Sequence, residues 1–206
     1  YLTSIKGKAS DLIIIYSSSG ITGLGNEAIN ITSGTSPITQ LNILSSATSG
    51  IITATISTTD IVDLDDLTGT GNAYTITVSD TSVSAAKLTA LNAKTTVDVT
   101  VSSATVTGTA SAITTVYGET GISGLGSEAI TVDSGTASVA DVNSLGALTT
   151  GTLTATVTEG DATTLKTITE SGNALTVTVT DTSVAAADLT SLDAATTAPI
   201  SVTSTT

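Results

Sequence analysis

The chain has 206 residues and a formal net charge of −13, from 18 acidic and 5 basic side chains. Such an excess of negative charge disfavours binding to nucleic-acid phosphates and to anionic membrane surfaces. The sequence contains no His and no Cys, which most often supply general bases and thiolate nucleophiles, so we expect no enzymatic activity.

The apolar residues are small and aliphatic: 39% of the chain is hydrophobic, but only 2% is aromatic. A core of Ala, Val, Ile and Leu suits a narrow, repetitive interior better than a globular centre. No run of about 18 apolar residues occurs, so we expect no membrane insertion. Because Met is absent, we expect Tyr1 to be an internal residue of a longer protein, and the absence of Cys fits an extracellular location.

A sequence repeat is the strongest pattern along the chain. Residues 20–35 read GITGLGNEAINITSGT and residues 121–136 read GISGLGSEAITVDSGT, an offset of 101 residues. Residues 71–86 and 172–187 match at the same offset. The predicted organisation is the end of a preceding repeat at 1–19, a first repeat of four coils at 20–120, and an incomplete second repeat at 121–206.

Each repeat subdivides into coils that begin with a strand-like alternation of apolar and hydroxyl residues. The strand-like runs follow one another at steps of about 22–23 residues, except for one step of about 33. A strand, a return segment and a further strand imply parallel pairing. We therefore predict a β-solenoid with parallel strands and short helical return segments, with a coil period of about 22–23 residues like that of leucine-rich repeats and one 33-residue coil per repeat. The runs begin near Ile29, Ile52, Thr75, Val97, Ile130, Leu153, Thr176 and Ala198.

The return segments carry apolar residues at steps of three to five, which predict one to three helical turns. Val139, Val142 and Leu145 are one such set. Ser138 precedes them, and Asp141 follows it by three residues, which resembles a capping box with Asp in place of the usual Glu or Gln. We expect a helix to begin there.

The glycines at Gly20, Gly23 and Gly25 loosely resemble a phosphate-binding loop. Their spacing is reversed relative to GxGxxG, and no Lys follows. We favour a structural turn, in which glycine supplies backbone conformations that other residues rarely adopt.

Acidic residues suggest calcium as the one cation to consider. The candidate stretch consists of Asp60, Asp63, Asp65 and Asp66. Its spacing is not that of an EF-hand, and the second copy keeps only Asp161, so we expect no cofactor and favour a solvated turn or helix start, with calcium as the alternative. Asp80 and Asp181 occupy matching turns, and we predict that they are turn or cap residues rather than ligands.

Threonines form TxT pairs on the predicted strands. If the aliphatic residues face inward, the hydroxyls face outward and stack from strand to strand. This surface has three interpretations: a solvated face of high β-propensity, a lateral packing surface for another copy, or an ice-binding surface, for which the coils are too uneven. The candidate assembly face consists of Thr53, Thr55, Thr75, Thr77, Thr154, Thr156, Thr176 and Thr178.

The strings GITGLGNEAI, TVSDTSVSAAKLTALNAKTT and TGTASAITTVY resemble the giant Ala/Thr/Ser-rich tandem-repeat proteins of the cell surface of marine cyanobacteria and related bacteria, which are adhesin-like β-strand repeat proteins. The resemblance covers essentially the whole chain. It implies an extracellular location, a very long parent protein and a role in a surface coat, adhesion or motility.

We therefore expect a structural or adhesive segment of a large extracellular surface or fibre protein that self-associates into filaments or a coat. Open coil edges are the main reason to expect self-association, because an unpaired strand edge templates another strand. The alternative is a binding module for a glycan, a mineral or a host receptor, including a repeat of the phage-fibre type.

Overall fold

The computed structural model describes residues 2–133 and 135–203. They form two compact units. The first unit consists of Tyr1–Asp80, Lys87–Ser102 and Glu119–Gly124, and the second of Thr81–Ala86, Ser103–Gly118 and Leu125–Thr206.

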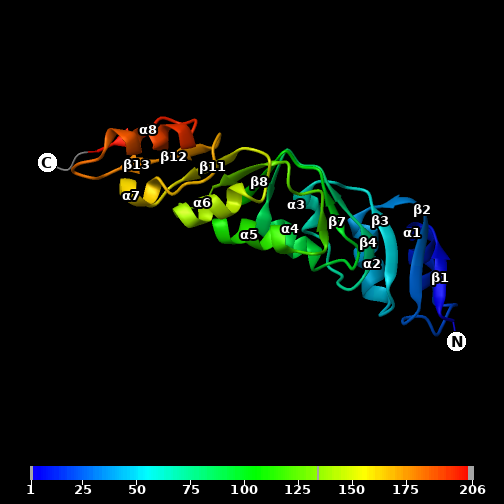
Figure 1. The fold of residues 1–206 in the computed structure, drawn as a ribbon. Coiled ribbons are helices and arrows are strands. Elements are labelled where there is room, and N and C mark those ends of the chain that lie inside the picture. Colours follow the sequence, from blue (N-terminus) through cyan, green and yellow to red (C-terminus); the bar gives the residue numbers. More distant parts are fainter. Residues whose placement is uncertain (1, 134, 204–206) are drawn as a thin grey trace. The chain divides into compact units, whose positions relative to one another are not determined.

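Both units have an α/β fold in which short helices alternate with short strands (Figure 1). Every strand pair within the described residues is parallel. The prediction of parallel strands joined by short helical return segments is therefore confirmed.

The first unit contains two sheets. One has the order β1 (Ser4–Gly7), β2 (Ala28–Ser36), β3 (Ile52–Ile56) and β4 (Ala73–Thr75), and the other the order β5 (Thr77–Val78), β7 (Val99–Val101) and β9 (Ile122–Ser123). The helices are α1 (Ala9–Ser17), α2 (Ile38–Ala47), α3 (Ile61–Leu64) and α4 (Ala85–Asn92), of which residues 87–92 belong to this unit.

The second unit also contains two sheets. One has the order β12 (Ala174–Thr176), β11 (Leu153–Thr156), β10 (Ala129–Val132), β8 (Thr105–Gly108) and β6 (Ser82–Ser84), and the other pairs β13 (Thr178–Val179) with β14 (Ser201–Val202). The helices are α5 (Ala110–Gly118), α6 (Val139–Gly146), α7 (Ala162–Leu165) and α8 (Ala186–Ala195).

The strand register corrects the predicted 33-residue coil. In the second unit Ser82 pairs with Thr105, and Thr105 pairs in turn with Ala129, so that the chain advances by about 23–24 residues from each strand to the next. The strand β8 thus lies inside the step that was predicted to be one long coil, and no long coil exists at that place. The alternation of apolar and hydroxyl residues did not predict β8, because Val106 is the only aliphatic residue of this strand.

The predicted alternation along the strands is confirmed in β3. Ile52, Ala54 and Ile56 are buried, while Thr53 and Thr55 are exposed. The aliphatic side of β3 therefore faces the core, as a period of two residues dictates.

One predicted strand is broken. The alternation over residues 74–78 predicted a single strand, but the structure ends β4 at Thr75 and begins β5 at Thr77, in a different sheet. Ile76, between them, is still buried. The alternation of the sequence predicts which side chains face inward, and it does so through the break at Ile76 as well as within each strand.

The helix predicted after Ser138 is confirmed as α6. It buries Val139, Val142 and Leu145, and Ser138 forms a capping box with Asp141. Within residues 2–133 and 135–203, no helix has the length and the apolar character that crossing a bilayer requires.

Candidate functional site

The predicted threonine face in the first unit is a row of three hydroxyl residues. The register of β2, β3 and β4 places Thr35 beside Thr55 and Thr55 beside Thr75, and all three are exposed. Adjacent strands lie about 4.8 Å apart, so the hydroxyls repeat at about that spacing. Thr53 has no such row, because its neighbours are Asn30 and Ala73.

The second unit carries a row that is less exposed, because Thr107 and Thr131 are half-buried. Thr107, Thr131 and Thr154 occupy successive register positions on β8, β10 and β11. Thr156 and Thr176 form a shorter row, and both are exposed. Sequence reasoning missed Thr107 and Thr131, although the TVT of β8 is itself a TxT pattern.

The eight predicted threonines are distributed over four sheets. Thr77 lies on β5 opposite Thr100, and Thr178 lies on β13 opposite Ser201. Both therefore belong to sheets other than those of their TxT partners, Thr75 and Thr176. Each unit thus presents short hydroxyl rows.

The acidic stretch that was considered for calcium is used for local contacts. Asp60 caps α3 by accepting a hydrogen bond from the Val62 N–H at 2.8 Å. Asp65 forms an ion pair with Lys87 at 2.6 Å. In the described part of the chain no three acidic side chains are grouped as a metal site. The contacts favour the interpretation of a helix start.

Asp80 and Asp181 are cap residues, as predicted, but they cap helices that precede them in the chain. The Oδ2 atom of Asp80 accepts a hydrogen bond from the Ile61 N–H at 3.0 Å, and that of Asp181 accepts one from the Ala162 N–H at 2.7 Å. A helix start leaves its first N–H groups without partners, and these carboxylates fill that need. Each contact joins a helix start to a turn 19 residues later in the chain.

The glycine loop encloses a buried carboxylate of the chain itself. Glu27 is only 1% exposed. Its carboxylate accepts hydrogen bonds from the Gly25 N–H at 3.0 and 3.1 Å, from the Asn26 N–H at 3.3 Å, and from the Tyr16 hydroxyl. Gly23 and Gly25 have φ angles of 84° and 133°, which confirms the structural turn.

The second copy repeats this arrangement 101 residues later. Buried Glu128 accepts hydrogen bonds from the N–H groups of Gly126 and Ser127 and from the Tyr117 hydroxyl. Sequence reasoning missed both Tyr–Glu pairs. The available signal was their recurrence at the repeat offset in a chain with four Tyr residues.

The Tyr16–Glu27 pair fixes the charge state of each partner. Burial, followed by the hydrogen bond to Glu27, raises the pKa of Tyr16 to about 12. Burial alone would raise the pKa of Glu27, but the hydrogen bonds from Tyr16 and from backbone N–H groups outweigh it and hold that pKa below its ordinary value. At neutral pH the carboxylate is ionised and enclosed by donors, which suits a structural contact rather than proton transfer.

Other buried polar side chains bond to backbone groups that lie 20 or 21 residues away in the chain. The Asn72 Oδ1 atom accepts a hydrogen bond from the Ile52 N–H at 2.8 Å, and Asn173 accepts one from the Leu153 N–H at the same distance. The Thr48 hydroxyl donates to the Glu27 carbonyl at 2.8 Å. Buried backbone groups need such partners, so these side chains connect segments that are distant in the chain.

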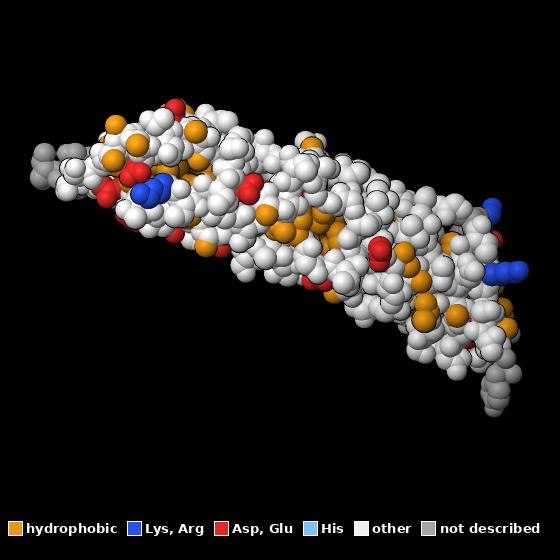
Figure 2. Space-filling view, viewed as in Figure 1, with side chains coloured by type: hydrophobic (Ala, Val, Ile, Leu, Met, Phe, Trp, Pro, Cys, Tyr) orange, Lys and Arg blue, Asp and Glu red, His pale blue; other side chains and the backbone are white. Residues whose placement is uncertain are grey.

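Uncharged polar side chains and backbone cover most of the visible face, with apolar patches and a few charged side chains among them (Figure 2). In the first unit a hollow of about 540 Å³ lies between α2 and the chain at Thr58 and Asp63. The Thr58 hydroxyl already donates to Asp63 there.

Comparisons of this chain with protein-family models, with curated proteins and with solved structures find no match.

Proposed function

We propose that this chain is a structural repeat segment, a β-solenoid, of a large extracellular surface or fibre protein. The observation that supports this most is the recurrence of the inter-coil contacts. In every strand pair the partners lie about one coil length apart in the chain. Buried polar side chains bridge them at positions that recur 101 residues later.

The role is mechanical rather than catalytic. Each coil obtains its hydrogen-bond partners from the next, so one coil alone does not fold and stability grows with the number of coils. The net charge of −13 keeps such a segment hydrated and soluble. The location at a cell surface and the adhesive role follow from the resemblance to adhesin-like repeat proteins.

The proposal is tested with chains of one, two and three tandem 101-residue copies. Each added copy contributes four to five coils at about 4.8 Å per coil, so the maximum dimension in small-angle X-ray scattering should grow by about 20 Å per copy. The melting temperature, followed by circular dichroism, should rise with each copy because more interfaces between coils form. A solenoid would be contradicted if the three chains had equal melting temperatures and if the maximum dimension grew only as it does for compact globular proteins of increasing mass.

A binding module is the second candidate function, favoured by the exposed row of Thr35, Thr55 and Thr75. A row of hydroxyls at a fixed spacing suits a repetitive ligand such as a mineral face or a glycan. On this candidate function, Thr55→Lys should lower adsorption to mineral particles at least threefold. Thr39→Lys, which adds the same charge at an exposed site on α2, should not. If both variants adsorbed equally well, the threonine row would be a solvated surface that does not bind the mineral.

A further inference from the structure

Residues 2–133 and 135–203 contain two ion pairs, one in each unit, and these pairs occupy equivalent positions of the two repeats. Asp65 pairs with Lys87 at 2.6 Å, and Lys166 pairs with Asp188 at 3.4 Å. The repeat offset of 101 residues converts positions 65 and 87 into 166 and 188. Both charges are therefore reversed from one repeat to the other, while the contact between the two positions is kept.

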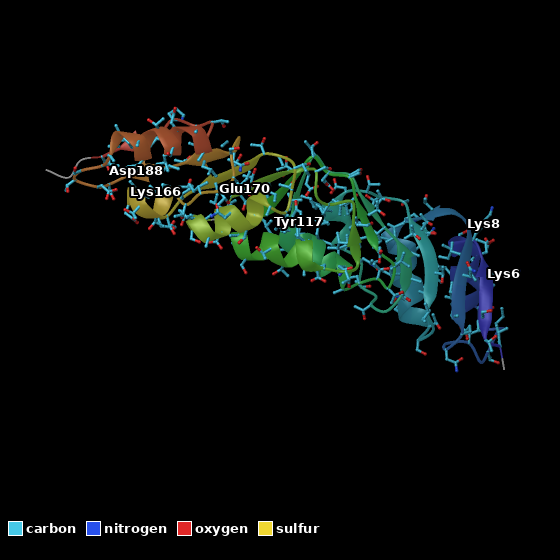
Figure 3. All side chains as sticks on the ribbon, in the orientation of Figure 1. Lys6, Lys8, Tyr117, Lys166, Glu170 and Asp188 are labelled. Atoms are coloured by element: carbon cyan, nitrogen blue, oxygen red, sulfur yellow. The ribbon has the colours of Figure 1, made fainter. Side chains whose placement is uncertain are left out.

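The two pairs connect corresponding elements. Asp65 directly follows α3, and Lys87 lies in the first turn of α4. In the second repeat Lys166 directly follows α7, and Asp188 lies in the first turn of α8. Figure 3 labels Lys166 and Asp188 where α7 and α8 lie next to each other. Each pair thus links a one-turn helix to the longer helix that follows it.

The neighbouring charges follow the same division. Residues 60–66 carry four aspartates, whereas residues 85–94 carry Lys87 and Lys94 and no acidic residue. The Lys94 Nζ atom donates a second bond to this segment, to the Asp65 carbonyl at 2.7 Å. Helix α8 instead carries two aspartates and no basic residue. The acidic segment of the first repeat therefore suits α4 in charge and is repelled by α8.

Ion pairing alone does not explain the reversal. The first turn of a helix favours an acidic side chain, because its free N–H groups carry partial positive charge. Asp188 meets this preference in α8, whereas Lys87 opposes it in α4. If both repeats had the arrangement of the second, both would form the ion pair and both helices would begin with the favourable charge. What the reversal adds is a difference between the repeats.

The adjoining sequences hardly distinguish the two repeats. Residues 71–86, which lie between the members of the first pair, closely match residues 172–187, which lie between the members of the second. Repeats that are this similar can exchange equivalent segments between copies, and such exchange is a characteristic failure in the folding of repeat proteins. The charges at the two positions are a feature by which the correct partner can be selected.

We propose that the reversed ion pairs select the partner of each segment, so that residues 60–66 pack against α4 and not against α8 of a second copy of this chain. In the exchanged arrangement Asp65 would face Asp188, and Lys166 would face Lys87. Single surface pairs are weak. Exchange, however, replaces two attractions by two repulsions, and all four changes act in the same direction. The proposal depends on the repeat and not on the proposed extracellular role.

Refolding from urea at high protein concentration tests this selection, because exchanged copies form oligomers that persist after refolding. The variant Asp65→Lys with Lys87→Asp gives the first repeat the charges of the second and keeps the net charge of −13. Its ion pair is restored in reversed order, so its circular dichroism before unfolding should match that of the wild type. After refolding, size-exclusion chromatography should show at least about fivefold more oligomer than for the wild type.

The reciprocal variant, Lys166→Asp with Asp188→Lys, makes the two repeats alike in the other direction and should form a similar excess of oligomer. The matched control combines all four substitutions. Its two pairs are again opposite in charge, so its oligomer fraction should return to that of the wild type. Each refolded sample is compared with the same sample before unfolding, which separates persistent exchange from reversible association.

Three outcomes would overturn the proposal. The first is a pair of double variants that refold with no more oligomer than the wild type, which would make the reversal a local compensation. The second is a fourfold variant that forms as much oligomer as the double variants do. The third is loss of the native circular dichroism in both double variants, because the reversed pairs would then not be equivalent to the original ones.

Discussion

Replacing Gly50 with Ala is expected to destabilise the first unit by about 3 kcal/mol. A Cβ atom at Gly50 would overlap the carbonyl group of Glu27 and lie 2.8 Å from the Ala28 nitrogen. These are backbone atoms at the start of β2, so no side chain can rotate to make room. Relief requires the two coils to separate at the point where the Thr48 hydroxyl bonds to the Glu27 carbonyl.

Urea unfolding followed by circular dichroism measures the effect. Gly20→Ala is the matched control, because the nearest atom to its Cβ, the Ser18 hydroxyl oxygen, is 3.7 Å away and Gly20 has no positive φ. Its change should be within about 0.5 kcal/mol. Gly151, whose Cβ would overlap the Glu128 carbonyl, should behave like Gly50 in the second unit. Equal stability of Gly50→Ala and Gly20→Ala would show that the coils separate at little cost.

The sequence allowed the direction of strand pairing and the inward residues to be predicted, because both depend on local spacing. The alternation at Ile52, Ala54 and Ile56 identifies the core side without knowledge of the partner strand. The break between β4 and β5 and the pairing of β8 depend on which strand lies alongside, and a period of two residues does not give that information.

The polar contacts between coils were predicted only in part. Ser138 and Asp141 are close in sequence, so their capping box was predictable. Tyr16 and Glu27 are 11 residues apart, so no local pattern links them. Glu residues are generally exposed, so a buried Glu27 carboxylate was not expected from the sequence. The close approach of Gly50 to Glu27 likewise joins residues that are distant in the sequence, so local patterns could not predict it.

Replacing Glu27 with Gln should destabilise the first unit by about 2–3 kcal/mol at pH 7. The amide keeps the size of the side chain, but one oxygen cannot accept all the hydrogen bonds that the Gly25 and Asn26 N–H groups and the Tyr16 hydroxyl donate. Tyr16→Phe should cost less, about 1–2 kcal/mol, because the backbone donors remain bonded. Asp66→Asn removes the same charge at an exposed site and should change little.

A double-mutant cycle of Glu27→Gln and Tyr16→Phe, measured by urea unfolding, isolates the contact. The double variant should cost less than the sum of the single variants, since either change alone already breaks the same hydrogen bond. Additive losses would mean that the two side chains act independently.

The same pair predicts how stability depends on pH. Because the pKa of Glu27 in the folded chain lies below its ordinary value of 4.5, its contribution is fully present above pH 4.5 and is lost as the pH falls toward the folded pKa. Because the pKa of Tyr16 is raised from 10.0 to about 12, its contribution is present below pH 10 and is lost between pH 10 and about 12. The unfolding free energy of Glu27→Gln should therefore fall less steeply in acid than that of the wild type, and that of Tyr16→Phe less steeply in alkali. If Glu27→Gln followed the acid profile of the wild type, the carboxylate would have the same proton affinity in the folded and unfolded chains, and its pKa would not be lowered by folding.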